Sequence, residues 1–110
     1  MQNAFYNYEQ WKLWADFHRY ILDDLIELEN YIGRENTKKG RMFTSRVYDY
    51  ILTLIKIFPF ANSMFILNNE LIRRGVFEKD YLIVYEVKEQ VIELLRIYHT
   101  SRNKDGIELR

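Results

Sequence analysis

The 110-residue sequence contains no cysteine, one proline and only four glycines. The absence of cysteine excludes disulfide scaffolds, thiolate metal sites and cysteine nucleophiles, and it suits a reducing compartment. Two histidines and scattered carboxylates give no metal-ligand spacing, and there is no glycine-rich phosphate loop. We therefore expect a protein that carries neither a metal ion nor another cofactor.

Net charge and long hydrophobic runs are also missing. The 16 basic residues balance 16 acidic residues, which argues against nonspecific binding of nucleic acid, because phosphate contacts dominate such binding. The longest apolar run, at residues 50–61, is interrupted by Lys56 and Pro59 and is too short to span a membrane. The first residues lack the pattern of a signal peptide. These features predict a cytoplasmic protein that does not associate with membranes.

What the sequence does contain is a large apolar fraction. It is 48% hydrophobic and 16% aromatic, a composition that is typical of a folded globular chain. No repeat or flexible linker divides it, so residues 1–110 are predicted to form a single domain. Residues 103–110 (NKDGIELR) contain an Asp-Gly turn and little apolar character, so we expect this tail to be weakly ordered.

Two segments show helical periodicity. Apolar residues recur every three or four positions over residues 17–32, with Asp16 as a candidate N-cap. Similar spacing over residues 37–58 is stopped by Pro59. The short polar connection between the two segments predicts an antiparallel helix pair.

Alternating residues predict strands on both sides of the helix pair. Residues 8–16 (YEQWKLWAD) alternate as a short edge strand, although a helix is also compatible with them. Residues 59–70 have the Asn-rich turn signals of a connection. Residues 70–78 then alternate as a strand, in which Gly75 indicates a bulge or a close backbone approach.

Residues 81–102 (YLIVYEVKEQVIELLRIYHTSR) fit two structures. A helix would place five apolar residues on one face: Val87, Val91, Leu94, Leu95 and Tyr98. A hairpin would turn at residues 88–90 and return through residues 91–98. The hairpin gives an α+β fold of order β-α-α-β-β-β, in which the helix pair covers one face of a small twisted antiparallel sheet. The helix gives a three- or four-helix bundle.

Three blocks of the sequence together resemble the RelE/ParE superfamily, the toxins of bacterial type II toxin–antitoxin systems. The blocks are DDLIELENYI (residues 23–32), RRGVFEKDYLIVYEV (residues 73–87) and IELLRIYHTSR (residues 92–102). They are similar to the superfamily's first-helix signature, to its arginine followed by a Tyr-x-x-x-Tyr strand, and to its closing strand with an Arg-Ile-x-His-x-x-Arg ending. The resemblance implies the hairpin, the α+β fold, and a toxin that a cognate antitoxin holds inactive in a hetero-oligomer.

For RelE-like members the resemblance implies metal-independent cleavage of ribosome-bound mRNA, by attack of a ribose 2′-hydroxyl on the adjacent phosphate. This chemistry needs a base, an acid and positive charge beside the phosphorane. The resemblance then assigns Arg74 to the phosphate, His99 to acid or base catalysis, and Tyr98 to orienting a base or donating a proton. The remaining arginines near this site would bind the substrate or the target: Arg73, Arg96 and Arg102.

Each of these residues also has an ordinary structural explanation. His99 could hydrogen-bond at the end of a strand, and Tyr98 could belong to the core, since the sequence has nine tyrosines. Arg73 and Arg74 are adjacent, so on a strand they would point to opposite faces. Only one of the two arginines could then reach a given site.

The balanced charge and the absence of basic residues from segment 59–69 (PFANSMFILNN) depart from the mRNA-cutting pattern. ParE-like members instead inhibit DNA gyrase by binding it, so both mechanisms stay open, and with them the question whether the chain is an enzyme. A third possibility is a degenerate toxin, or a helical module, that only binds a partner. Asp23 and Asp24 of the first-helix block are expected to face solvent or a partner.

Overall fold

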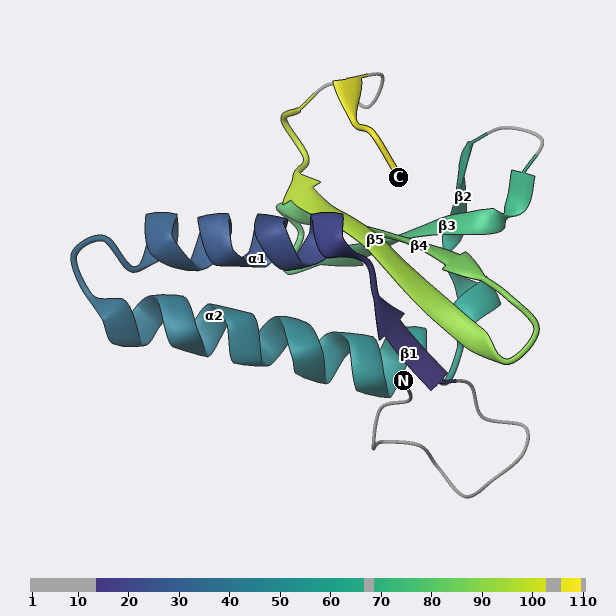
Figure 1. Ribbon diagram of the computed structural model, residues 1–110, viewed down its shortest axis with the longest axis horizontal. Coiled ribbons are helices and arrows are strands. Elements are labelled where there is room, and N and C mark those ends of the chain that lie inside the picture. The colour runs from purple at the N-terminus through teal and green to yellow at the C-terminus, as the bar shows by residue number, and fades with distance from the viewer. Residues whose placement is uncertain (1–13, 67–68, 103–105, 110) are drawn as a thin grey trace.

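The computed structural model describes residues 14–66, 69–102 and 106–109. Within these residues the chain forms a pair of helices beside a five-stranded sheet (Figure 1). The helices are α1 (Arg19–Ile32) and α2 (Thr37–Tyr50), and the strands are β1 (Trp14–Phe17), β2 (Ser63–Ile66), β3 (Asn69–Phe77), β4 (Tyr81–Val87) and β5 (Val91–His99). The predicted α+β fold is confirmed.

The sheet has the strand order β1-β5-β4-β3-β2. β1 pairs in parallel with β5, with Trp14 opposite Val91, whereas the other pairs are antiparallel. The sheet is therefore mixed rather than fully antiparallel as expected. The reason is topological: the helix pair carries the chain from one edge of the sheet to the other, which leaves β1 beside the last strand.

β2 is an additional strand in the segment that was expected to be a connection. It is four residues long and forms the other edge of the sheet. Its pairing with β3 shifts in register between Met64 and Ile66. A strand this short and irregular leaves almost no alternation in the sequence by which it could be detected.

The hairpin at residues 81–102 is confirmed, with the turn at residues 88–90 closed by a 2.8 Å hydrogen bond from the Lys88 N–H to the Val91 carbonyl. β5 contains a β-bulge at Leu95: Val84 lies opposite Arg96 and Tyr85 opposite Leu94.

The bulge explains the helix-like spacing of this stretch. The adjacent Leu94 and Leu95 are both fully buried, but on opposite faces of the sheet. Because both faces of β5 are covered, its apolar residues form a nearly continuous run and do not alternate with polar ones.

α1 is capped by His18, whose Nδ1 accepts a 3.1 Å hydrogen bond from the Tyr20 N–H. The prediction that Asp16 caps this helix was wrong, because the extended backbone of β1 continues to Phe17 and leaves Asp16 exposed within the strand. Gly33 ends the helix, with its N–H bonded to the Glu29 carbonyl at 2.9 Å.

α2 begins after Asn36, whose side chain accepts a hydrogen bond from the first turn. Beyond its α-helical part the chain continues as a π-helical turn, η1 (Ile51–Ile55), and Pro59 then opens a short 3-10 turn, η2 (Pro59–Ala61). The wider turn keeps Ile51 and Ile55 fully buried. The helix therefore still packs on the sheet where it approaches the predicted stop at Pro59.

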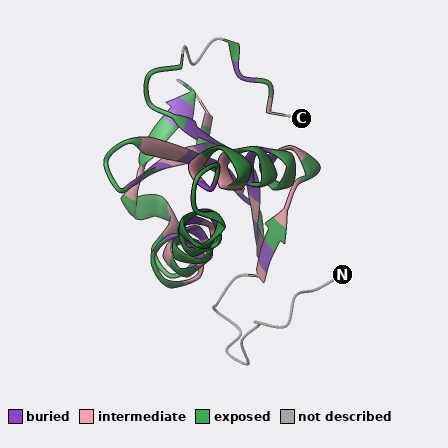
Figure 2. Ribbon diagram, turned by 90° about the vertical axis from the view of Figure 1, so that its left-hand side faces the viewer, coloured by how far each residue is buried: buried purple, intermediate pink, exposed green. Residues whose placement is uncertain are grey.

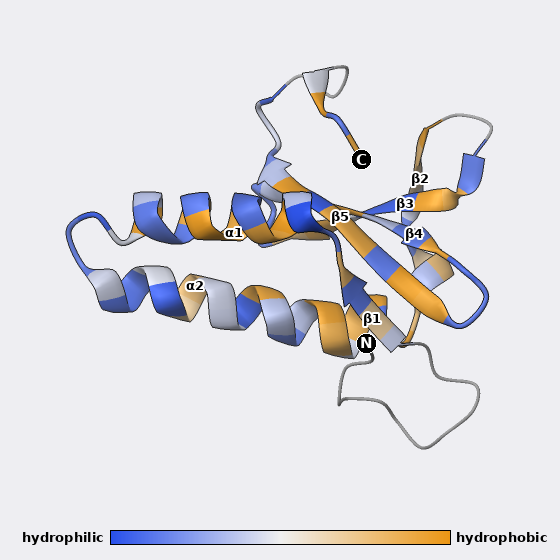
Figure 3. Cartoon of the chain, in the orientation of Figure 1, coloured by the Kyte–Doolittle hydropathy of each residue, from blue (hydrophilic) through white to orange (hydrophobic). Residues whose placement is uncertain are grey.

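Two apolar clusters cover the two faces of the sheet. Figure 2 marks the buried residues of the helices and strands in purple. The larger one lies between the helices and the sheet and includes Ile21, Leu25, Phe43, Val47, Ile51, Ile55, Phe77, Ile83, Tyr85, Leu94 and Ile97. The smaller one, here called the outer cluster, consists of Phe65, Ile72, Val84, Leu95, Tyr98 and Ile107. Figure 3 shows hydrophobic residues in β5 and in the C-terminal segment that contributes to the outer cluster.

Ile107 shows that part of the C-terminal tail is seated on the sheet, because only 9% of it is exposed. Residues 103–105 and 110 lie outside the described residues. The weak order of residues 103–110 stays a prediction.

Gly75 permits a close approach between the sheet and the end of α2, one of the two arrangements predicted for it. A Cβ at this position would lie 2.9 Å from the Tyr50 hydroxyl oxygen. Next to it, the hydroxyl of the fully buried Tyr85 donates to the Pro59 carbonyl at 2.6 Å and accepts from the Asn62 amide at 3.0 Å. These bonds fasten the 59–62 segment to the sheet.

We expect Gly40→Ala to destabilise the protein. A methyl group at Gly40 of α2 would overlap the backbone carbonyl oxygen of Glu29 in α1. Overpacking against backbone should cost about 3 kcal/mol, the upper end of its usual range, and the better helix propensity of alanine offsets about 1 kcal/mol of this. Unfolding in urea should therefore show a net loss of about 2 kcal/mol. The control is Gly106→Ala, where nothing lies within 4 Å of the added Cβ. Equal stability of both variants would contradict the close packing of the helices.

Candidate functional site

Arg74, Tyr98 and Arg102 lie together at the sheet face that is opposite the helices. Arg74 is two positions after Ile72 on β3 and therefore shares its face, where Tyr98 is a member of the outer cluster. Burial raises the pKa of the Tyr98 hydroxyl above its usual value, while the nearby positive charges of Arg74 and Arg102 act in the opposite direction. The result is a neutral phenol close to two cations.

His99 faces the other way. Its ring lies 5.5 Å from the ring of Tyr81, which packs against the larger core on the helix side. The His99 Nδ1 accepts a 3.0 Å hydrogen bond from the Ser101 N–H and lies 2.9 Å from the Ser101 hydroxyl oxygen. In the neutral ring this bond leaves the proton on Nε2. Tyr98 and His99, adjacent on β5, therefore point to opposite faces of the sheet.

Arg73 is occupied by contacts at the β2 edge. Its guanidinium donates to the carbonyls of Glu70 at 2.7 Å and Asn62 at 2.9 Å, and it lies over the Phe60 ring at 5.0 Å. It also lies on the face opposite Arg74, as expected for neighbours on a strand. Of the two arginines, Arg74 is the one beside Tyr98.

Arg96 forms the best-connected ion pair among the described residues. Its Nε and Nη2 donate to the two carboxylate oxygens of Asp24 at 2.8 and 2.9 Å, and Asp24 also accepts from the Ile97 N–H at 3.0 Å. The side chains are only 14% and 10% exposed. The hydrogen bonds with Asp24 raise the pKa of Arg96 above the ordinary arginine value, against an opposing effect of burial. This geometry commits Arg96 to holding α1 on β5.

The expectation that Asp24 faces solvent or a partner was wrong. Asp24 lies three positions after Ile21 and four before Leu28, on the buried stripe of α1. This spacing is a signal in the sequence that Asp24 points inward. Asp23 is exposed as expected, with a loose 3.9 Å contact to Arg19.

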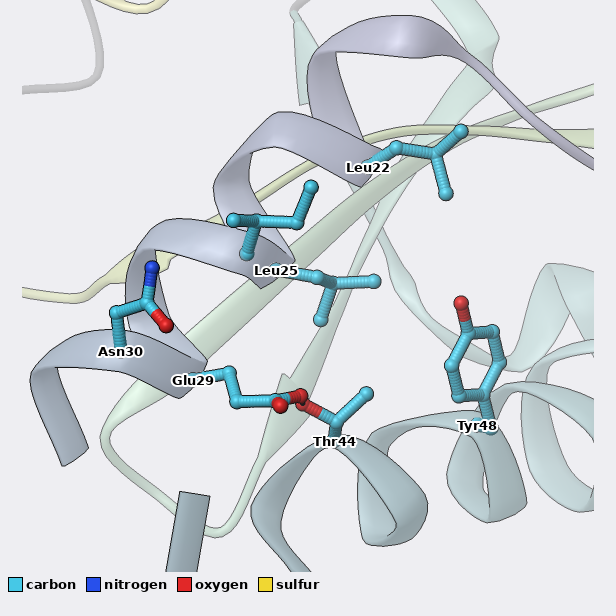
Figure 4. A pocket seen from close by; sticks show the side chains of 7 residues that line it. Leu22, Leu25, Glu29, Asn30, Thr44 and Tyr48 are labelled. Atoms are coloured by element: carbon cyan, nitrogen blue, oxygen red, sulfur yellow. Dashed lines mark hydrogen bonds between the residues drawn. The ribbon is translucent and has the colours of Figure 1, made fainter. Parts of the chain in front are cut away.

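A groove of about 390 Å³ runs between the two helices (Figure 4). It is lined by Leu22, Leu25, Ile26, Glu29, Asn30, Thr44 and Tyr48. Across the groove the Thr44 hydroxyl donates to the Glu29 carboxylate at 2.7 Å. No arginine lines the groove, and sequence analysis did not anticipate it.

Other kinds of site find little support in the described part of the chain. Its histidines and carboxylates form no group of three that could hold a metal ion. Nor does it contain a helix with the length and hydrophobicity needed to cross a bilayer. The geometry thus leaves the Arg74–Tyr98–Arg102 surface, hereafter the arginine face, as the place where the predicted site residues gather.

Comparison with known proteins identifies the family. The sequence model of the "ParE toxin of type II toxin-antitoxin system, parDE" matches residues 15–104. The chain belongs to the ParE toxin family. The predicted membership of the RelE/ParE superfamily is therefore confirmed, and with it a toxin of a type II toxin–antitoxin system whose partner is a cognate antitoxin.

Solved structures agree with this fold. A chain described as "Chromosomal ParDE TA system from P. aeruginosa" matches with a TM-score of 0.65 and 15% identity, covering 77% of this chain and 92% of the other. The conserved hypothetical protein HP0894 from Helicobacter pylori matches with a TM-score of 0.50 and 23% identity, covering 80% and 94%. No curated protein matches the sequence significantly.

We expect Asp24→Asn to destabilise this ParE-family toxin by about 3 kcal/mol, because it leaves the buried positive charge of Arg96 without its negative partner. Asp23→Asn is the matched control on the same helix, and its exposed contact should be worth about 0.5 kcal/mol or less. Both values can be measured by urea unfolding followed by circular dichroism. Similar losses in the two variants would show that the Asp24–Arg96 pair does not hold α1 on the sheet.

Proposed function

We propose that this ParE-family toxin arrests growth by binding DNA gyrase, without catalysis of its own. The observation that carries the proposal is the opposite orientation of Tyr98 and His99. mRNA cleavage would require an acid, a base and a phosphate-binding cation around one phosphate. Arg74 and Tyr98 share a face of the sheet, but His99 lies on the other and bonds to Ser101.

The arginine face is the surface that we assign to the gyrase contact. The guanidinium groups of Arg73 and Arg96 donate hydrogen bonds to other residues of the chain. No described side chain pairs with the guanidinium of Arg74 or Arg102, and Arg102 is exposed. Arginine beside tyrosine is a composition that often dominates the energy of protein interfaces.

Cleavage of ribosome-bound mRNA is the second candidate, and one observation favours it. The guanidinium groups of Arg74 and Arg102 lie near the hydroxyl of Tyr98, and burial raises the pKa of this hydroxyl. A neutral hydroxyl beside two cations could donate a hydrogen bond to a phosphate that the arginines bind. In this mechanism His99 would have to take part from the other side of β5.

The two mechanisms can be separated with purified chain, measuring inhibition of gyrase supercoiling and cleavage of mRNA on ribosomes in parallel. Gyrase binding predicts inhibition that is unchanged in His99→Ala and weakened in Arg74→Ala, whose half-inhibitory concentration should be about tenfold higher for a loss of about 1.4 kcal/mol. Arg41→Ala, an exposed arginine of α2, serves as the control for lost charge. Cut mRNA that disappears in both His99→Ala and Arg74→Ala would overturn the proposal in favour of the nuclease.

A further inference from the structure

Four large hydrophobic side chains lie exposed together at the β2 edge of the sheet, on the face opposite Arg74. Each exposes between 39% and 51% of its surface, and they are here called the edge patch: Phe60, Met64, Ile66 and Leu71. Met64 lies opposite Arg73, and Leu71 is two positions before Arg73, so the three share a face. Ile66 lies opposite Asn69, two positions before Leu71, and shares it too. The Arg73 guanidinium covers the Phe60 ring.

The helix pair does not cover this part of the sheet, although the edge patch is on its side. β2 lies at the end of the molecule that is away from the helices (Figure 1). Among the described residues, the larger core cluster includes none from β2 and none from residues 69–74 of β3. Figure 3 shows that β2 is nevertheless hydrophobic. The edge patch is therefore an apolar surface that the chain's own helices leave open.

The β2 edge also lacks charge. Residues 57–69 (IFPFANSMFILNN) contain no charged side chain. β2 has a neighbouring strand, β3, on one side only, and exposed edge strands usually carry charged side chains that prevent pairing with another chain. An uncharged edge flanked by exposed apolar side chains is typical of a surface that contacts another protein.

A second copy of the chain fits this surface. In a two-fold symmetric contact the same patch meets itself, so any charge in the patch would oppose its own copy. The one charged group at the edge patch is Arg73, whose guanidinium already donates to the carbonyls of Glu70 and Asn62. Two β2 strands related by a two-fold axis would run antiparallel, which is the orientation in which β2 already pairs with β3.

The available area is sufficient for a weak dimer. At the exposures given above, the four side chains offer roughly 350 Å² of apolar surface per copy. Apolar atoms make up a little over half of a typical interface, so a contact centred on the edge patch would bury roughly 600 Å² per copy. The total of roughly 1,200 Å² is at the lower limit for specific, stable interfaces.

We propose that the toxin forms a two-fold symmetric dimer in which the edge patches of two copies pack together, with the axis beside Met64. The two sheets would then be neighbours at their β2 edges. The arginine face lies on the other side of the sheet, so the dimer leaves it accessible. The dimer is therefore compatible with binding to gyrase and does not depend on it.

Sedimentation of the toxin, purified free of antitoxin, tests the dimer. The wild-type chain should dimerise with a dissociation constant on the order of 10 µM. Met64→Lys should weaken association at least about tenfold, because it places two positive charges beside the axis. Met42→Lys, at an exposed position of α2, is the matched control and should associate like the wild type. A wild-type chain that stays monomeric at about 100 µM, or equal weakening in both variants, would overturn the proposal.

A mixing experiment shows whether the patch meets its own copy. Met64→Glu alone should also associate at least about tenfold more weakly than the wild type, whereas an equimolar mixture with Met64→Lys should associate at least as tightly as the wild type. Circular dichroism establishes that both variants are folded. A mixture that associates no better than either variant alone would show that position 64 does not face its own copy, and would overturn the two-fold arrangement.

A different occupant of the edge patch would be recognised in the same set of proteins. Weaker binding of the cognate antitoxin to Met64→Lys, together with a monomeric wild type, would assign the patch to the antitoxin and overturn the dimer. A higher half-inhibitory concentration of Met64→Lys for gyrase, again with a monomeric wild type, would assign the patch to the target. Gyrase inhibition by a monomeric toxin would leave the proposed function intact, so the two proposals fail separately.

Discussion

The ion pair between Asp24 and Arg96 is the interaction on which the arrangement of this toxin depends. It fixes the rotation of α1 over the sheet, because the same carboxylate also accepts the backbone N–H of Ile97. The bulge at Leu95, just before Arg96, shifts the register of β5 by one residue. Arg96 therefore lies on the same face of the sheet as Val84. The arginine then reaches past α1 to the carbonyl of Glu108. One mostly buried side chain thus links the first helix, the last strand and the C-terminal segment, elements from opposite ends of the chain.

Much of the fold could be predicted from the sequence, because the helix pair has strong periodicity and its turn is polar. Residues 81–102 could be assigned to a hairpin only through resemblance. A bulge that buries Leu94 and Leu95 on opposite faces removes the alternation that identifies a strand. The parallel pairing of β1 with β5, and β2 itself, could not be predicted either. Both depend on which edge of the sheet the helix pair reaches, and four-residue strands carry little pattern of their own.

The candidate site was predictable to the extent that strand geometry governs it. Successive side chains of a strand point to opposite faces, so Arg73 and Arg74 must lie on different faces of the sheet. The same rule separates Tyr98 from His99 once β5 is known to be a strand. The role of Arg96 could not be foreseen, since its partner Asp24 is far away in the sequence and the bulge sets where the two meet. Catalytic motifs recognised by order and spacing therefore say which residues are near each other along the chain, and not which face they share.

The parallel pairing of β1 with β5 has a consequence for the order in which the sheet folds. β1 is the first of the described strands in the sequence and β5 is the last, yet the two are neighbours in the sheet. The long loop between them must close before the sheet has both edges, and such distant pairings form late in folding. The sheet therefore gains its β1 edge only after β5 has formed, and this pairing completes it.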